Sequence, residues 1–417
     1  MESIHYSKRA VKGEWLLILM PLIYSVGFVY SDSLHGMGKI ISFFSAILFI
    51  FGYYAIRYKS SKSVSTDCAY LLAFYSVLSL ILSLTVDYDS IRGIFLNPAF
   101  ILPYLCVLLS TKKYDYNMPK IIIKGIEISA ILFIIFSFIN FRAFLNGYTG
   151  RDAILFLRDS SISFDSVSKN FAACVGLGLL LAQFLKPRTL IILLCAFAIN
   201  LLMAVFLGRR NIIFTNCLYL IASCYLYARY AKIPRALKYC IILAGVLATV
   251  YGAINFTSFL QNSENPLFKT LNERMDIDSR GSVIEYYDED MNSNPLNWII
   301  GKGIDSKYYC PGVEETSYRR TVEAGWRQII MKVGVIGFVL YLLILLPAVF
   351  KKKRNLLTKA CAIYILIGLI ELYPAGVPSF YLQYILLWIV ASICYDSKFA
   401  SLSDQLVKSE ILANKKL

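Results

Sequence analysis

The sequence predicts an all-α, polytopic integral membrane protein with about twelve transmembrane helices. Hydrophobic residues make up 58% of the 417 residues and aromatic residues 15%, which leaves too little charge to cover the surface of a soluble chain of this size. Apolar runs of roughly the 20 residues that span a bilayer recur along almost the whole sequence. The predicted spans are residues 15–30, 39–56, 68–86, 93–110, 121–141, 170–185, 189–207, 211–228, 239–256, 329–350, 358–376 and 379–395.

Short turns separate the spans except at two places, both expected on the outer side of the membrane. The shorter loop covers residues 142–169, and one long polar loop covers residues 257–328 between spans nine and ten. Within the long loop, Asp278-Ser279 has the residue types that cap a helix start, and Gly301-Lys302-Gly303 is typical of a turn. Residues 396–417 form a polar tail that is too short to fold alone. The chain is therefore expected to form a single membrane domain, residues 1–417.

Lysine and arginine set the expected orientation, because they concentrate in short loops on the cytoplasmic side. Basic runs at residues 57–62, 229–238 and 351–354 place both termini in the cytoplasm. We interpret these runs, and the net charge of +15, as topology anchors that also attract anionic lipid, not as a nucleic-acid surface. Only two histidines occur, and neither lies in a predicted span, which excludes a histidine-rich metal centre.

Arg209 and Arg210 follow the seventh predicted span at its outer end, where the positive-inside rule disfavours arginine. Guanidinium groups form forked hydrogen bonds with phosphate oxygens, so this pair could bind the pyrophosphate of a lipid. The alternative is that both side chains only reach ordinary lipid phosphates. We favour the binding role because both arginines lie on the outer side, where the positive-inside rule disfavours them.

A second basic group, Arg319, Arg320 and Arg327, surrounds Glu323 just before the tenth span. In a helix these four residues would share one face within two turns, which would place a carboxylate among guanidinium groups. Such a carboxylate stays ionised and suits a base that orients a hydroxyl. A stabilising salt-bridge cluster is an equally good interpretation. Trp326 could stack on a sugar, although an anchor in the interfacial aromatic belt is the somewhat stronger interpretation.

The remaining charged residues give weaker signals. Glu371, near the outer end of the eleventh span, needs a partner inside the membrane, and pairing with Arg209 or Arg210 is expected. Arg280 by itself is an ordinary loop arginine. Three pairs of aspartates on the outer side could coordinate a divalent ion, but solvated loop acids are the stronger interpretation, so no metal site is predicted. The pairs are Asp87 and Asp89, Asp276 and Asp278, and Asp288 and Asp290.

Three places in the chain resemble the superfamily of O-antigen polymerases and O-antigen ligases. Gly208-Arg209-Arg210 is similar to the arginine motif at the outer end of the corresponding span. Arg280, followed by residues 294–304, resembles the loop arginine and its downstream proline and Gly-x-Gly turn. Residues 322–326 and 332–337 resemble the loop exit that runs into the next span. The likeness in topology extends over nearly the whole chain.

This resemblance implies a GT-C type membrane glycosyltransferase that needs neither metal nor cofactor and inverts the transferred sugar. It would move a glycan from undecaprenyl pyrophosphate to an acceptor hydroxyl at the periplasmic face of the bacterial inner membrane, as in the synthesis of O-antigen or a related surface polysaccharide. Arg209, Arg210 and Arg280 would stabilise the departing pyrophosphate. Glu323 would accept or orient the acceptor proton.

The second basic group is expected to bind substrate in the same reaction. Arg319 and Arg320 would hold the acceptor or the second phosphate, with Trp326 and Arg327 beside them. The ligase branch is expected to have a histidine where this chain has Glu323, so the resemblance favours a polymerase, whose acceptor is another lipid-linked repeat unit and whose partner could include a chain-length regulator.

Two alternatives stay open. A ligase would differ from the polymerase only in its acceptor. A lipid-linked oligosaccharide flippase would share the substrate and the number of spans, but it should place charged residues in a central cavity, whereas the predicted spans contain few charges.

Overall fold

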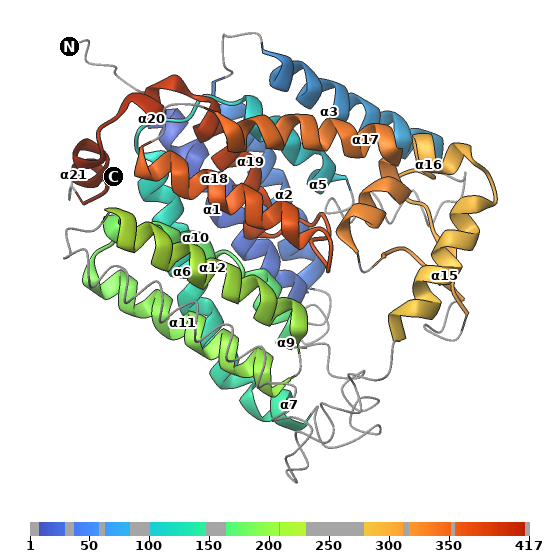
Figure 1. Ribbon diagram of the computed structural model, residues 1–417, viewed down its shortest axis with the longest axis horizontal. Helices are drawn as coiled ribbons and strands as arrows, with labels where there is room; N and C mark the ends of the chain where they lie inside the picture. The colour runs from blue at the N-terminus through green and yellow to red at the C-terminus, as the bar shows by residue number, and fades with distance from the viewer. Residues whose placement is uncertain are drawn as a thin grey trace.

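The protein is an all-α membrane protein, and its helices form one bundle with a smaller lobe at one end (Figure 1). The computed structural model describes residues 8–29, 37–57, 63–83, 101–146, 164–207, 209–230, 279–311, 317–322, 324–351 and 355–412. The elements that form the bundle are α1 (Lys8–Val29), α2 (Met37–Ala55), α3 (Val64–Ser83), α5 (Leu102–Leu105), η2 (Cys106–Thr111), α6 (Met118–Ile139), α7 (Phe141–Asn146), α9 (Phe164–Val167), η3 (Ser168–Ala172), α10 (Val175–Leu180), η4 (Ala182–Phe184), α11 (Pro187–Phe206), α12 (Arg210–Tyr230), α17 (Gly325–Phe350), α18 (Leu356–Glu371), α19 (Leu382–Tyr395), α20 (Ser397–Ser401) and α21 (Asp404–Leu412).

Seven helices among the described residues are long and apolar enough to cross a membrane: α1, α2, α3, α6, α11, α12 and α17. Each coincides with a predicted span. The predicted spans at 93–110, 358–376 and 379–395 correspond to the shorter elements α5 with η2, α18 and α19. The predicted span at 239–256 lies outside the described residues. The membrane-embedded character is thus confirmed, whereas the count of twelve spans stays a prediction.

The predicted span at 170–185 is broken into short pieces. The chain passes through α9, the π-helical turn η3, α10 and the 3₁₀ turn η4 within 21 residues, from Phe164 to Phe184. Hydropathy predicts this stretch as one helix because it is apolar throughout. A π-helical turn widens the helix and is often found at functional sites, and η3 places Lys169 and Asn170 near the end of the bundle where α12 begins.

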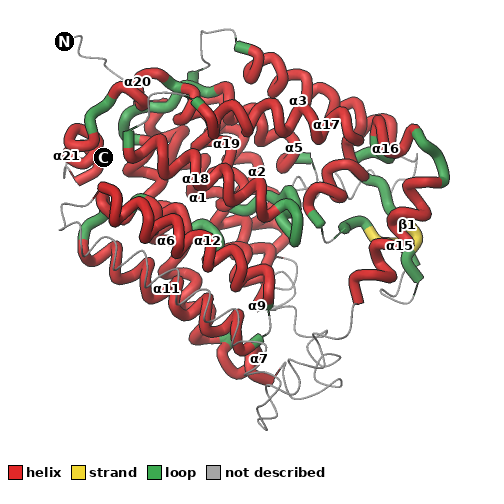
Figure 2. The backbone as a smooth tube through the Cα atoms, viewed as in Figure 1, coloured by secondary structure: helices red, strands yellow, loops and turns green. Residues whose placement is uncertain are grey.

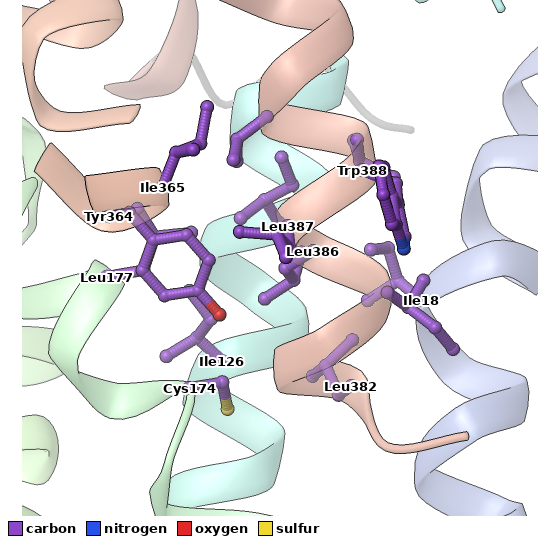
Figure 3. Packing of buried hydrophobic residues seen from close by; sticks show 14 of the residues in the cluster. Ile18, Ile126, Cys174, Leu177, Tyr364, Ile365, Leu382, Leu386, Leu387 and Trp388 are labelled. Carbon is purple, nitrogen blue, oxygen red and sulfur yellow. The ribbon is translucent and has the colours of Figure 1, made fainter. Parts of the chain in front are cut away.

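The core of the bundle surrounds α19. Figure 3 shows Leu386 and Leu387 of this helix between Tyr364 of α18 and Ile18 of α1. Residues 385–394 of α19 are all buried, as expected for a helix that is hydrophobic on every side. Two hydrogen bonds join the tail to the start of α18: the Asn355 side chain donates to the carbonyls of Phe399 and Leu402. The described part of the tail, residues 396–412, therefore packs as part of the bundle.

The smaller lobe, which we call the polar segment, comprises residues 279–322. It contains α15 (Ser279–Asn292), α16 (Leu296–Ile300) and a two-stranded antiparallel hairpin, β1 (Tyr308–Tyr309) and β2 (Tyr318–Arg319). The lobe lies at the opposite end of the molecule from α20 and α21, and the two short strands are visible beside α15 (Figure 2). The helix predicted to start at Ser279 and the turn predicted at residues 301–303 are both confirmed.

The polar segment has its own small core. Tyr287, Met291, Tyr308 and Cys310 are buried there with Val283, Val322, Ile330 and Met331, the last two from α17. Cys310 is a free thiol in this core. Because α17 contributes to both cores, the polar segment is fixed directly to a helix of the bundle.

Candidate functional site

A break in α17 joins the polar segment to the bundle. Gly334 has φ 65° and ψ 179° inside this helix, a conformation that side-chain-bearing residues rarely adopt. The break interrupts the helical hydrogen-bond ladder, and other groups bind the carbonyls that precede it. The Lys302 backbone N–H donates to the Met331 carbonyl at 2.7 Å, and the Ser79 hydroxyl of α3 donates to the Lys332 carbonyl at 2.7 Å.

A group of basic side chains gathers beside this break. Lys332 is buried, with 3% of its surface exposed, and its Nζ donates to the Ser306 carbonyl at 2.6 Å. Arg320 lies with its Nη2 3.5 Å from Oδ1 of the buried Asp305, and Lys302 forms an ion pair with Asp290. Asp305, Arg320 and Lys302 all lie within electrostatic range of Lys332. We call Lys302, Arg320 and Lys332 the basic cluster.

The cluster is built from three parts of the chain. Lys332 comes from α17, Lys302 from the turn after α16, and Arg320 from the residue after β2. Asp305 Oδ1 accepts no hydrogen bond, so its contact with Arg320 is ionic. Among the described residues, the carboxylates that pair with the basic cluster are Asp305 and Asp290. A group of basic side chains held together in this way favours an anionic ligand.

Arg327 anchors α15 to the start of α17. Its Nη1 lies 2.6 Å from Oδ1 of Asp288, and its guanidinium lies over the rings of Tyr287 and Trp326, at 5.3 and 4.9 Å from their centres. Burial raises the pKa of Tyr287, so the phenol stays protonated and donates to the Arg327 carbonyl at 3.2 Å. Trp326 packs against the small core of the polar segment. Arg327 and Trp326 are therefore structural anchors, whatever else they bind.

The predicted helical face of Arg319, Arg320, Glu323 and Arg327 is wrong. Arg319 lies in β2, opposite Tyr308 of β1, and α17 starts only at Gly325. The hairpin pairing between distant residues outweighs the local helical spacing. The structure still brings Arg320 and Arg327 into one region, through Gln328, whose side chain accepts from the Val322 N–H and donates to the Arg320 carbonyl. Glu323 lies outside the described residues.

The other predicted arginines lie apart from the basic cluster. Arg209 forms an ion pair with Asp165 of α9 at 3.0 Å, and the exposed Arg210 is the first residue of α12. This places both at the α9 side of the bundle (Figure 1). Arg280 lies in the first turn of α15. Asp165 was not singled out from the sequence, where it is one of several acids in a loop.

Glu371 does not have the arginine partner expected from the sequence. Its carboxylate accepts a hydrogen bond from Nε2 of Gln383 at 2.7 Å, and the cation within electrostatic range is Lys169 of η3. Glu371 ends α18 next to the start of α17, because the Trp326 N–H donates to the Leu372 carbonyl. Trp326, at the start of α17, therefore contacts both the polar segment and the end of α18.

The aspartate pair in α15 binds cations of the protein itself. Asp288 pairs with Arg327 and Asp290 with Lys302, so these acids fasten α15 to its neighbours. The other two predicted pairs, 87 with 89 and 276 with 278, lie outside the described residues. Within the part of the chain that the structure describes, no three histidine, cysteine or acidic side chains gather in a way that could hold a metal ion.

Sequence reasoning passed over Asp305 and Lys332 as individual residues. A lysine inside a long apolar run was a usable signal for Lys332, since buried cations are expensive. Asp305 had no comparable signal, because its partner Arg320 approaches it only after the hairpin folds. Comparison of the chain with protein-family models, with curated proteins and with solved structures yields no match.

Proposed function

We propose that this chain is a glycosyltransferase of the GT-C type that polymerises undecaprenyl-pyrophosphate-linked oligosaccharide repeat units. The product would be O-antigen or a related surface polysaccharide, made at the periplasmic face of the inner membrane. The observation that supports this most is the basic cluster. It stands where the membrane helices α3 and α17 meet the folded polar segment, at the boundary where the phosphates of a lipid-linked substrate would lie.

The chemistry of the proposed reaction needs cations at that boundary. The bond between the sugar C1 and the phosphate oxygen breaks, and negative charge grows on the departing pyrophosphate. Lysine and arginine already held in place stabilise this charge without further rearrangement. Arg320 is suited to the role because its guanidinium is 40% exposed while Asp305 fixes its position. Arg319 precedes Arg320 in the chain, and Gln328, the neighbour of Arg327, donates to the Arg320 carbonyl.

A polymerase also needs a second site, because its donor and its acceptor both have a lipid pyrophosphate. Arg209 and Arg210 at the start of α12 provide another cationic position, away from the basic cluster. Arg210 is exposed and Arg209 is 45% exposed, so phosphate oxygens can reach both. Two separate cationic positions fit two lipid-linked substrates better than they fit one.

The test is polymerisation in vitro with purified protein, a synthetic undecaprenyl pyrophosphate repeat unit of verified native structure, and a chelator. We expect a glycan ladder from the wild type. Arg320→Ala and Arg210→Ala should each lower its rate by roughly 100-fold or more, the usual effect of removing one charge-stabilising donor. Arg229→Ala is the matched control, because this arginine is exposed at the opposite end of α12 and should keep full activity.

Other outcomes distinguish the alternatives. If Arg320→Ala and Arg210→Ala both polymerise like Arg229→Ala, neither cationic position binds pyrophosphate as proposed. If the wild type makes no ladder from the verified repeat unit, the polymerase proposal fails. Independently of this assay, a deletion strain separates the three classes. A single-repeat surface glycan indicates a lost polymerase, inward-facing lipid-linked intermediate a lost flippase, and outward-facing intermediate without surface glycan a lost ligase. A ladder that requires added divalent metal would contradict metal independence.

A further inference from the structure

Glu371 is a carboxylate at the end of α18, and its hydrogen-bond partner in the described structure is not an arginine. Its hydrogen bond comes from the neutral amide of Gln383. The side chain is half-buried and lies within range of Lys169, whose own side chain is exposed. A carboxylate kept at such a position costs free energy, and in membrane proteins this cost usually accompanies a function.

Two buried polar groups lack hydrogen-bond partners, one on Asn170 next to Lys169 and one on Tyr219. Asn170 Oδ1 on the π-helical turn and the Tyr219 hydroxyl on α12 are both unpartnered, and each residue is 1% exposed. Tyr219, like Tyr364 of α18, lies within electrostatic range of Glu371. Because helical side chains tilt toward the helix N-terminus, Tyr219 points toward the Arg210 end of α12. Unpartnered buried polar atoms are costly and need an explanation.

The chemistry of these groups matches a sugar hydroxyl. Asn170 Oδ1 and the carboxylate of Glu371 accept hydrogen bonds, and the Tyr219 hydroxyl both donates and accepts. The amide of Gln383 is fixed in turn, because Tyr364 donates to the Gln383 carbonyl at 2.8 Å. Acceptors that lack donors favour a ligand rich in hydroxyl groups over an anion.

The first turn of α17 links Glu371 to the basic cluster. The Trp326 N–H donates to the Leu372 carbonyl, directly after Glu371. Gly325 packs against the backbone of Gly376, where an added Cβ would lie 2.5 Å from a carbonyl oxygen. Two residues beyond Trp326, Gln328 binds the Arg320 carbonyl. Glu371 therefore has a fixed position relative to Arg320.

We propose that Glu371 is the base that accepts the proton of the acceptor hydroxyl, with Asn170 and Tyr219 binding the same sugar. This rests on the proposed polymerase function and assigns the proton to Glu371 instead of Glu323. The acceptor oxygen forms a bond with C1 of the donor sugar while the bond from C1 to the phosphate oxygen breaks. The electron pair of the broken bond leaves with the pyrophosphate, and the hydroxyl proton passes to the Glu371 carboxylate and then to water.

The experiment compares Glu371→Gln with Glu323→Gln in the polymerisation assay. Glutamine has the size of glutamate and keeps a group for Gln383, but it cannot accept the proton. We expect Glu371→Gln to lower kcat by about 100-fold or more with an unchanged KM for the donor, the usual contribution of a general base. Glu285→Gln is the matched control, because this glutamate is exposed on α15 and has no role in either proposal, and it should stay within about threefold of the wild type. A Glu371→Gln rate within that range would overturn the proposal.

Lys169→Met provides a second test that leaves the carboxylate in place. The Lys169 side chain is exposed, so folding should not suffer. In the part of the chain that the structure describes, the ionisable groups within electrostatic range of Glu371 are Lys169 of η3 and the tyrosines 219, 341 and 364. Removing the positive charge should move the acid limb of the pH–rate profile to higher pH, and an unmoved limb would contradict the assignment.

The two proposals fail in different ways. No ladder from the wild type removes the polymerase function and this inference with it. A wild-type ladder, together with a Glu371→Gln protein that polymerises at the wild-type rate, removes only the role of Glu371. A ladder lost in Glu323→Gln and kept in Glu371→Gln would return the proton to Glu323.

Discussion

Replacing Gly334 by alanine should loosen the contact between α16 of the polar segment and α17. At φ 65° and ψ 179° an alanine is strained, at a cost of about 1–3 kcal/mol. The added Cβ would also lie 2.5 Å from the Ile300 carbonyl carbon and closer still to the Ile299 carbonyl oxygen. Both contacts are with backbone atoms, so no side-chain rotation can relieve them. The end of α16 has to move away from α17.

This movement should break the hydrogen bonds that depend on the close approach. The Lys302 N–H would lose the Met331 carbonyl, and the Tyr75 hydroxyl would lose the Ile300 carbonyl, which it now binds at 2.6 Å. Each bond contributes about 1 kcal/mol. Together with the strain, we expect a destabilisation of about 3–5 kcal/mol, confined mainly to the contact between α16 and α17.

Hydrogen exchange of the detergent-solubilised protein can localise this effect. In Gly334→Ala, amides of residues 296–303 should exchange faster, while those of α19 should not change. Gly368→Ala is the matched control: this glycine lies inside α18, and an added Cβ would meet only a flexible leucine side chain at 3.1 Å. If both variants show equal exchange in residues 296–303, the glycine at 334 is not required and the reasoning is wrong.

Two further predictions concern buried polar groups. Ser79→Ala should cost about 1–3 kcal/mol in thermal unfolding because it leaves the Lys332 carbonyl unsatisfied, whereas Ser76→Ala, which removes a bond of equal length to Leu72 of its own helix, should cost less; equal losses would contradict this. Burial lowers the pKa of Lys112 to about 8. The unfolded chain then binds the proton that the folded chain releases, so stability should rise between pH 8 and the ordinary lysine value of 10.5, and the rise should be smaller in Lys112→Met.

Local features of the sequence predict local features of the fold. Long apolar runs predict the seven long helices because a backbone inside lipid must satisfy its own hydrogen bonds. Ser279 marks the start of α15, and the glycines at 301 and 303 mark a turn. In each case the residues that determine the structure are neighbours in the chain.

The parts that sequence reasoning missed depend on distant residues. Arg319 has a helical spacing with Arg327, yet the strand pairing with Tyr308 places it outside the helix. Asp305 meets Arg320 across 15 residues of chain, and Ser79 meets Lys332 across more than 250. The π-helical turn at 168–172 follows from packing, since Ser168 binds Asn200 and Ser129 binds the Phe171 carbonyl. No pattern of neighbouring residues in the sequence predicts these long-range contacts.

The break in α17 places the candidate groups on both of its sides. Lys332 lies two residues before Gly334, and the break presents its ammonium group to the Ser306 carbonyl of the polar segment. On the preceding turn, Gln328 holds Arg320 while Trp326 binds the end of α18 beside Glu371. In the proposed reaction, a pyrophosphate at the basic cluster would therefore have its sugar at a fixed position relative to Glu371. Fixed relative positions of this kind account for a large part of enzymatic rate enhancement, so the strained glycine and the proposed chemistry depend on the same contact.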